Sequence, residues 1–190
     1  MTDIAGYCVV LRAPEDIIKS TNPRYRGLYR MPPWSLRQFK EGFDDPYMFG
    51  NYVNEVGLIK TLSSAQEVAE RFTEVIAPSE LEIIYSQTCE EDPRQPVGFQ
   101  FLGYDVAAPE SPFWSLVADF PLNISAFRVF FEKLNENGLF GIKADAKNFL
   151  TAYRNHKVLH YDTPKVLWMI YCVGWNDEEK GDRLLFPHEN

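Results

Sequence analysis

Apolar residues recur along the chain with two different spacings, one typical of helices and the other typical of strands. The clearest helical stretch covers residues 64–77, where apolar side chains recur every three or four positions and share one face. Ser64 and Glu67 form a capping-box pattern at its beginning. The same spacing predicts two further helices, over residues 124–136 and 145–156.

Four segments rich in β-branched and aromatic residues predict strands, at residues 5–12, 81–85, 97–106 and 166–173. In the third segment the apolar positions change parity, which indicates a β-bulge at Leu102 and Gly103. The fourth is apolar without a break and predicts an internal strand covered on both faces. Together the elements predict an α+β fold, with a mostly antiparallel central sheet of about five strands and three main helices chiefly on one face.

Residues 20–60 combine turn-forming residues with large aromatic side chains. Prolines and glycines break regular structure there, whereas the rings need a surface on which to pack. We therefore expect an irregular but ordered wrap on a single globular domain that spans residues 1–190. Inspection of the sequence finds no internal repeat.

The chain is acidic, with a net charge of -8. Such a surface repels phosphate backbones and suits a basic protein partner. Three cysteines are too few and scattered for a disulfide framework, and no apolar run has the length that spans a bilayer. The N-terminus lacks a basic, signal-like region, so we expect a soluble, cytoplasmic protein.

Familiar catalytic signatures are missing from the sequence, among them the phosphate-binding glycine loop, the nucleophile elbow and the zinc-protease motif. His156 and His160 have the spacing of two metal ligands, but Pro164 indicates that the helix ends before His160. We therefore expect no metal or cofactor. One enzymatic alternative stays open, a small hydrolase or transferase with a carboxylate-based site near Asp105.

The basic segment of residues 19–40 leaves a nucleic-acid alternative open, because it interleaves cations with aromatic rings. Arginines mixed with aromatics can stack on bases and pair with phosphates. In an acidic chain these cations are instead expected to pair with carboxylates of the same molecule. Nucleic-acid binding is therefore the less favoured interpretation.

Charge and aromatic residues favour a protein partner. The neighbouring acids Glu90, Glu91 and Asp92 can steer a basic partner toward the chain. Trp114 stands in a turn-prone segment where a large ring can anchor an interface, and Asp105 directly follows the predicted bulge. We predict a non-catalytic binding protein that uses these five residues for contact.

A family resemblance adds to this prediction. The strand end Gly103-Tyr104-Asp105-Val106, the loop with Trp114 and the Leu-Asn-Glu-Asn-Gly-Leu-Phe of residues 134–140 resemble small bacterial immunity proteins encoded beside polymorphic toxins. The resemblance covers roughly residues 98–172, and the prolines of residues 108–112 depart from the pattern. It implies an inhibitor that binds a cognate toxin, expected to be basic, one to one.

Overall fold

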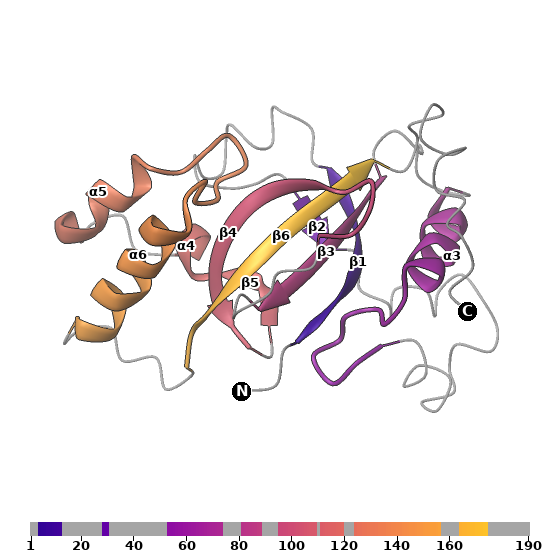
Figure 1. Ribbon diagram of the computed structural model, residues 1–190, viewed down its shortest axis with the longest axis horizontal. Coiled ribbons are helices and arrows are strands. Elements are labelled where there is room, and N and C mark those ends of the chain that lie inside the picture. The colour runs from indigo at the N-terminus through magenta and orange to yellow at the C-terminus, as the bar shows by residue number, and fades with distance from the viewer. Residues whose placement is uncertain are drawn as a thin grey trace.

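The computed structural model describes residues 4–12, 28–30, 53–73, 81–88, 95–109, 111–119, 124–156 and 164–174. They form an antiparallel sheet with helical segments at its two ends (Figure 1). The strands are β1 (Ala5–Arg12), β2 (Leu28–Arg30), β3 (Leu81–Thr88), β4 (Gln100–Ala108), β5 (Ser111–Ser115) and β6 (Val166–Gly174). The helices are α3 (Leu62–Phe72), α4 (Leu116–Asp119), η3 (Ser125–Phe127), α5 (Arg128–Phe131) and α6 (Lys143–Asn155).

The described strands lie in the order β2-β1-β3-β6-β4-β5, and each registered pair is antiparallel. The predicted α+β class and antiparallel sheet are confirmed. The predicted number of strands is not, because four long strands form the centre and two short strands, β2 and β5, lie at the edges. The wrap predicted for residues 20–60 lies mostly outside the described residues.

All three predicted helices have different bounds in the structure, and the one predicted over residues 145–156 is α6. Helix α3 begins before Ser64 because Thr61 is its N-cap, and the Thr61 hydroxyl oxygen accepts a hydrogen bond from the Ser64 N–H at 3.1 Å. The continuous helix predicted over residues 124–136 is wrong. The chain forms only the short η3 and α5 there, because the following residues turn back to pair with β4.

The strand order reads as two similar units placed side by side. The first unit comprises β1, β2, α3 and β3, and the second comprises β4, β5, α6 and β6. Tyr7 of β1 and Tyr104 of β4 are equivalent, because each exchanges backbone hydrogen bonds with a turn that precedes a helix. Tyr7 lies opposite Tyr85 of β3, and Tyr104 lies opposite Met169 of β6. This makes Tyr85 and Met169 equivalent, and the sequence-based finding of no internal repeat is therefore wrong.

An approximate two-fold axis passes through the centre of the sheet. The residues that follow Tyr85 and Met169 are Ser86 and Ile170, and these two equivalent residues pair directly with each other. Because β3 and β6 are antiparallel neighbours, an axis perpendicular to the sheet between them relates one unit to the other. Figure 1 shows the outcome, with α3 beyond one end of the sheet and α6 beyond the other.

The two long helices repeat the same buried stripe. Their buried residues have identical spacing: Ala65, Val68, Ala69 and Phe72 in α3, and Ala146, Phe149, Leu150 and Tyr153 in α6. Helix α3 packs in one apolar cluster with Val9 and Ile83, and α6 packs with their equivalents Val106 and Leu167. Equivalent strand positions face the same side, so both helices cover one face of the sheet, as predicted.

A tight turn before each helix extends the sheet edge. Residues 54–59 and residues 135–140 carry the related sequences Asn-Glu-Val-Gly-Leu-Ile and Asn-Glu-Asn-Gly-Leu-Phe. Ile59 exchanges both backbone hydrogen bonds with Tyr7, each 2.8 Å long, and Phe140 does the same with Tyr104 at 2.8 and 3.0 Å. We call these segments the edge turns.

An asparagine holds each edge turn in place. Oδ1 of Asn135 accepts hydrogen bonds from the N–H groups of Asn137 and Leu139, at 3.0 and 3.1 Å, and its Nδ2 donates to the Leu102 carbonyl at 2.7 Å. The Asn54 side chain makes the corresponding three bonds in the first unit. One side chain thus satisfies two turn donors and joins the turn to the neighbouring strand.

We expect Asn135→Ala to lower the free energy of unfolding by about 2 kcal/mol, since it leaves partly buried backbone groups without their partners. Urea unfolding followed by circular dichroism measures the change. Asn54→Ala should have a similar effect, and Asn148→Ala, on the exposed side of α6, serves as the control. Equal stability of Asn135→Ala and the unaltered protein would contradict this role of the side chain.

The predicted bulge in β4 is confirmed and bends the sheet. The register of β4 against β6 shifts between Phe101 and Gly103, and Gly103 has a φ of 147°. Figure 1 shows β4 as a pronounced arc. Phe99, just before β4, consequently reaches Tyr7 of β1 with ring centroids 6.0 Å apart, although β3 and β6 lie between those strands.

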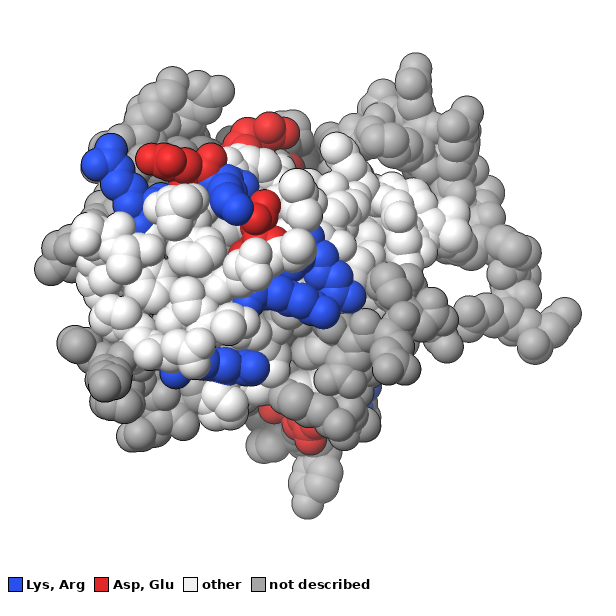
Figure 2. Space-filling model, turned by 60° about the vertical axis from the view of Figure 1, so that its left-hand side comes forward, with Lys and Arg blue, Asp and Glu red and all other residues white. Residues whose placement is uncertain are grey.

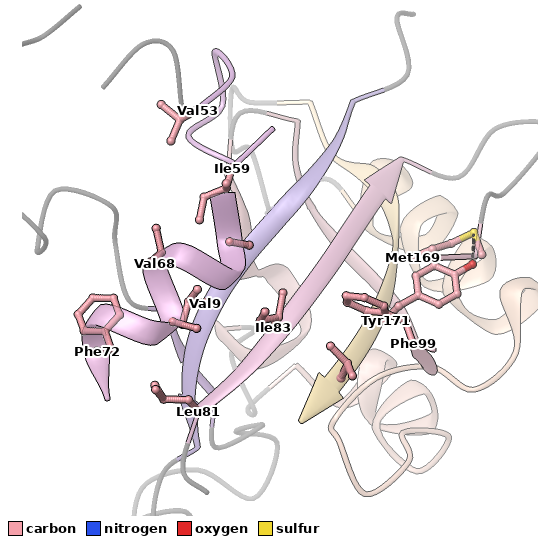
Figure 3. Packing of buried hydrophobic residues seen from close by; sticks show 13 residues of the cluster. Val9, Val53, Ile59, Val68, Phe72, Leu81, Ile83, Phe99, Met169 and Tyr171 are labelled. Atoms are coloured by element: carbon pink, nitrogen blue, oxygen red, sulfur yellow. Dashed lines mark hydrogen bonds between the residues drawn. The ribbon is translucent and has the colours of Figure 1, made fainter. Parts of the chain in front are cut away.

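Apolar side chains fill both faces of this curved sheet. Figure 3 shows the cluster under α3, where Val68 and Phe72 meet Val9, while Tyr171 and Met169 continue the cluster along β6. On the opposite face, Trp168, Ile170 and Cys172 are all buried. The prediction that β6 is an internal strand is therefore confirmed.

Candidate functional site

Asp105 lies on β4, and its side chain has no exposed surface. Its Oδ1 accepts hydrogen bonds from the backbone N–H of Val106, at 2.8 Å, and from the Ser115 hydroxyl, at 2.6 Å. Trp168 lies opposite Asp105 on β6 and donates its indole N–H to the Ala108 carbonyl at 3.3 Å. The Asp105 carboxylate therefore links β4 to the end of β5.

The first unit shows what its own fold requires at the position of Asp105. Cys8 is the equivalent residue, and it is also buried, with its thiol directed to the Val9 carbonyl at 3.3 Å. A unit of the same design thus folds with an almost apolar side chain there. The carboxylate is a property of the second unit, where Ser115 provides its partner.

The structure brings two of the predicted contact residues into one corner of the sheet. Trp114 is part of β5 and directly precedes Ser115, which bonds to Asp105. Glu90, Glu91 and Asp92 lie outside the described residues. A buried Asp105 has no surface to offer a partner, so its position supports a structural role in joining β4 to β5.

The other candidate groups are placed as follows. His156 directly follows α6, and its ring packs against Phe127 with centroids 5.4 Å apart, whereas His160 lies outside the described residues. Of the basic segment 19–40, the structure describes only the short strand β2. Among the described residues, no three His, Cys, Asp or Glu side chains are grouped so that they could hold a metal ion.

The end of the molecule around α5 and α6 exposes apolar and basic side chains together. Val129 on α5 is 53% exposed, and Ile142, the N-cap residue of α6, is 62% exposed. Lys147 and Arg154 are exposed along α6. Figure 2 turns this side toward the viewer and shows Lys and Arg, some of them beside Asp or Glu, on a mostly uncharged surface.

The charge at this end differs in sign from that of the whole chain. Residues 124–156 and 164–174 contain six Lys and Arg but three Asp and Glu. Two of the three acids face cations of the same segment, since Lys133 bonds to Asp145 and the Arg128 guanidinium lies 3.7 Å from Glu132. The local excess is therefore positive.

Sequence reasoning did not single out Ile142, Lys147 or Arg154. Their separate positions along the chain give no sign that they belong to one end of the molecule. A signal was nevertheless present, because the edge-turn sequences and the spacing of buried residues recur in both halves. The spacing from Gly6 to Asn54 exceeds that from Gly103 to Asn135, which hides the repeat from inspection at a constant period.

Comparison with known proteins gives no assignment: no family model, curated protein or solved structure matches this chain. Among the described residues, no helix is long and apolar enough to cross a membrane.

Proposed function

We propose that this chain is a non-catalytic binding protein of the immunity type, which inhibits a cognate toxin by one-to-one association. The observation that carries the proposal is the exposed surface around α5 and α6, where exposed Val129 directly follows Arg128 and exposed Ile142 directly precedes Lys143. Apolar side chains next to arginine are typical of protein interfaces. The family resemblance of residues 98–172 supports the same class of function.

The enzymatic alternative depends on Asp105 and is the weaker proposal. A general acid or base needs to reach the reacting atoms within hydrogen-bond distance. Asp105 is fully buried, and one of its oxygens already accepts from Val106 and Ser115. This arrangement favours a structural carboxylate over a reactive one.

The nucleic-acid alternative depends on residues 19–40, and little of that segment is described. The net charge of -8 disfavours the close approach of a phosphate backbone. A protein partner fits both the charge of the chain and the exposed apolar residues.

The experiment is co-expression with the product of the adjacent gene, followed by purification of any complex. We expect that product to be toxic when expressed alone, and harmless when this chain is present in equal amount. Binding should be tight and one to one, as measured by light scattering and calorimetry. A neighbour that is not toxic and does not bind would contradict the proposal.

The acidic loop can be tested in the same system. Charge reversal at Glu90, Glu91 and Asp92 should slow association with a basic toxin at low salt and have little effect on dissociation. An unchanged association rate would place the contact surface elsewhere on the chain.

A further inference from the structure

The two units provide an internal comparison between residues that the fold needs and residues that it does not. Structural positions are shared: the glycine beneath each edge turn, the asparagine that holds the turn, the leucine at its end and the buried stripe of each helix. Side chains on the outer sides of α3 and α6 have no such constraint, so differences there report on other requirements.

The helix charge rises from α3, with one excess acid, to α6, with two excess cations, although Arg71 corresponds to Ala152 and Ser64 to Asp145, which are changes in the opposite direction. Where the first unit has the neutral residues Gln66 and Thr73, the second unit has the cations Lys147 and Arg154. Where α3 has the acids Glu67 and Glu70, α6 has the neutral residues Asn148 and Thr151. Two acids have been replaced by neutral residues and two neutral residues by cations, at positions equivalent in the fold.

The outer side of α6 is also the more accessible of the two. Lys147, Asn148, Thr151 and Arg154 are all exposed, whereas among the equivalent residues of the first unit Glu70 is exposed and Gln66, Glu67 and Thr73 are only partly exposed. Ile142, at the beginning of α6, adds an apolar side chain to this surface. We call Ile142, Lys147, Asn148, Thr151 and Arg154 the α6 face.

We infer that the α6 face is a contact surface for an acidic protein segment, one with carboxylates for Lys147 and Arg154 and an apolar side chain for Ile142. The inference rests on the proposed binding function, and it concerns one acidic segment of a partner that is expected to be basic as a whole. Charge complementarity carries it, since a basic helix side on a chain of net charge -8 is matched by carboxylates on the other side of the interface.

A protein segment fits this face better than a nucleic acid does. The overall negative charge repels a continuous row of phosphates, whereas a short acidic segment can meet the local cations alone. Ile142 gains from burial against an apolar side chain. Asn148 can donate to or accept from a peptide backbone, and the Thr151 hydroxyl, which donates to the Lys147 carbonyl, can accept from one.

The test uses a short fluorescein-labelled peptide rich in glutamate with interspersed leucine, titrated with the full chain at low salt and followed by fluorescence anisotropy. The decisive variant moves the cations from α6 to α3 by combining Lys147→Gln and Arg154→Thr with Gln66→Lys and Thr73→Arg. Its net charge equals that of the unaltered protein. We expect its affinity for the peptide to be roughly fivefold lower, as for the loss of two exposed ion pairs.

Lys147→Glu, which alters a single exposed side chain, provides a second variant whose folding is not in question. It should also weaken binding, and far-ultraviolet circular dichroism should match that of the unaltered chain. Peptide affinity that is undetectable in the unaltered protein, or that is the same in the charge-moved variant, would overturn the inference. Tighter binding of labelled oligothymidylate, lost in the same variant, would overturn it in favour of nucleic acid.

These outcomes are separate from those of the proposed function. If the adjacent gene product is neither toxic nor bound but the peptide still binds through the α6 face, the immunity proposal fails and the inference stands. If the toxin is neutralised equally well by the charge-moved variant and the peptide does not bind, the inference fails and the immunity proposal stands.

Discussion

Gly103→Ala is expected to lower the free energy of unfolding by about 3 kcal/mol or more, through backbone strain and overpacking together. Gly103 has a φ of 147°, which residues with a side chain rarely adopt. A Cβ atom there would lie 2.7 Å from the Leu139 Cβ and 2.9 Å from the Phe140 carbonyl oxygen. Neither atom belongs to a flexible side-chain end, so the edge turn itself would have to move.

Urea unfolding at equilibrium measures this effect, and two other glycines calibrate it. A Cβ on Gly141 would meet no atom within 4 Å, so Gly141→Ala should change stability by less than about 0.5 kcal/mol. A Cβ on Gly6 would lie 2.6 Å from the Leu58 Cβ, and Gly6→Ala should cost about 2 kcal/mol from overpacking alone. A Gly103→Ala variant as stable as Gly141→Ala would disprove the close approach of strand and edge turn.

Trp168→Ala should be destabilising by about 4 kcal/mol, because it removes the largest fully buried side chain of the second unit. Trp168 has no exposed surface and lies in the cluster on the face away from the helices, with Ile170 as its neighbour. The substitution also removes the hydrogen bond from the indole N–H to the Ala108 carbonyl. Thermal and urea unfolding both report the loss.

Trp168→Phe separates volume from hydrogen bonding, since it keeps an aromatic ring but has no N–H donor. We expect its stability to lie between those of Trp168→Ala and the unaltered protein. Val97→Ala is the control for truncating a solvent-exposed apolar side chain, because Val97 is 70% exposed. A Trp168→Ala variant that unfolds at the same urea concentration as Val97→Ala would show that β6 is not internal.

The duplicated design separates the residues that the fold needs from those that the proposed binding function can use. Asn54 and Asn135 perform one structural task in two places, as do Gly6 and Gly103. The outer sides of α3 and α6 carry no such shared residues. Substitutions at the shared positions should therefore affect folding, and those on the α6 face should affect binding at unchanged stability.

Sequence alone predicted the elements whose pattern is local. The period of apolar residues located α3 and α6 to within a few residues, since buried positions on a helix recur at a fixed spacing. The unbroken apolar run of β6 indicated an internal strand, and the parity change beside Gly103 indicated the bulge. Each of these signals depends on neighbours within about ten residues.

The tertiary structure decided what depends on residues far apart in the chain. Ser86 pairs with Ile170 across the centre of the sheet, and no local pattern specifies that the two halves meet there about a two-fold axis. Burial of Asp105 likewise follows from β5 folding back onto β4, which brings Ser115 to its carboxylate. The local sequence does not distinguish a strand carboxylate that faces solvent from one that faces the core, because its burial is set by long-range packing. The composition of the chain determined that it is acidic, but only the fold determined that the exposed side of α6 is basic.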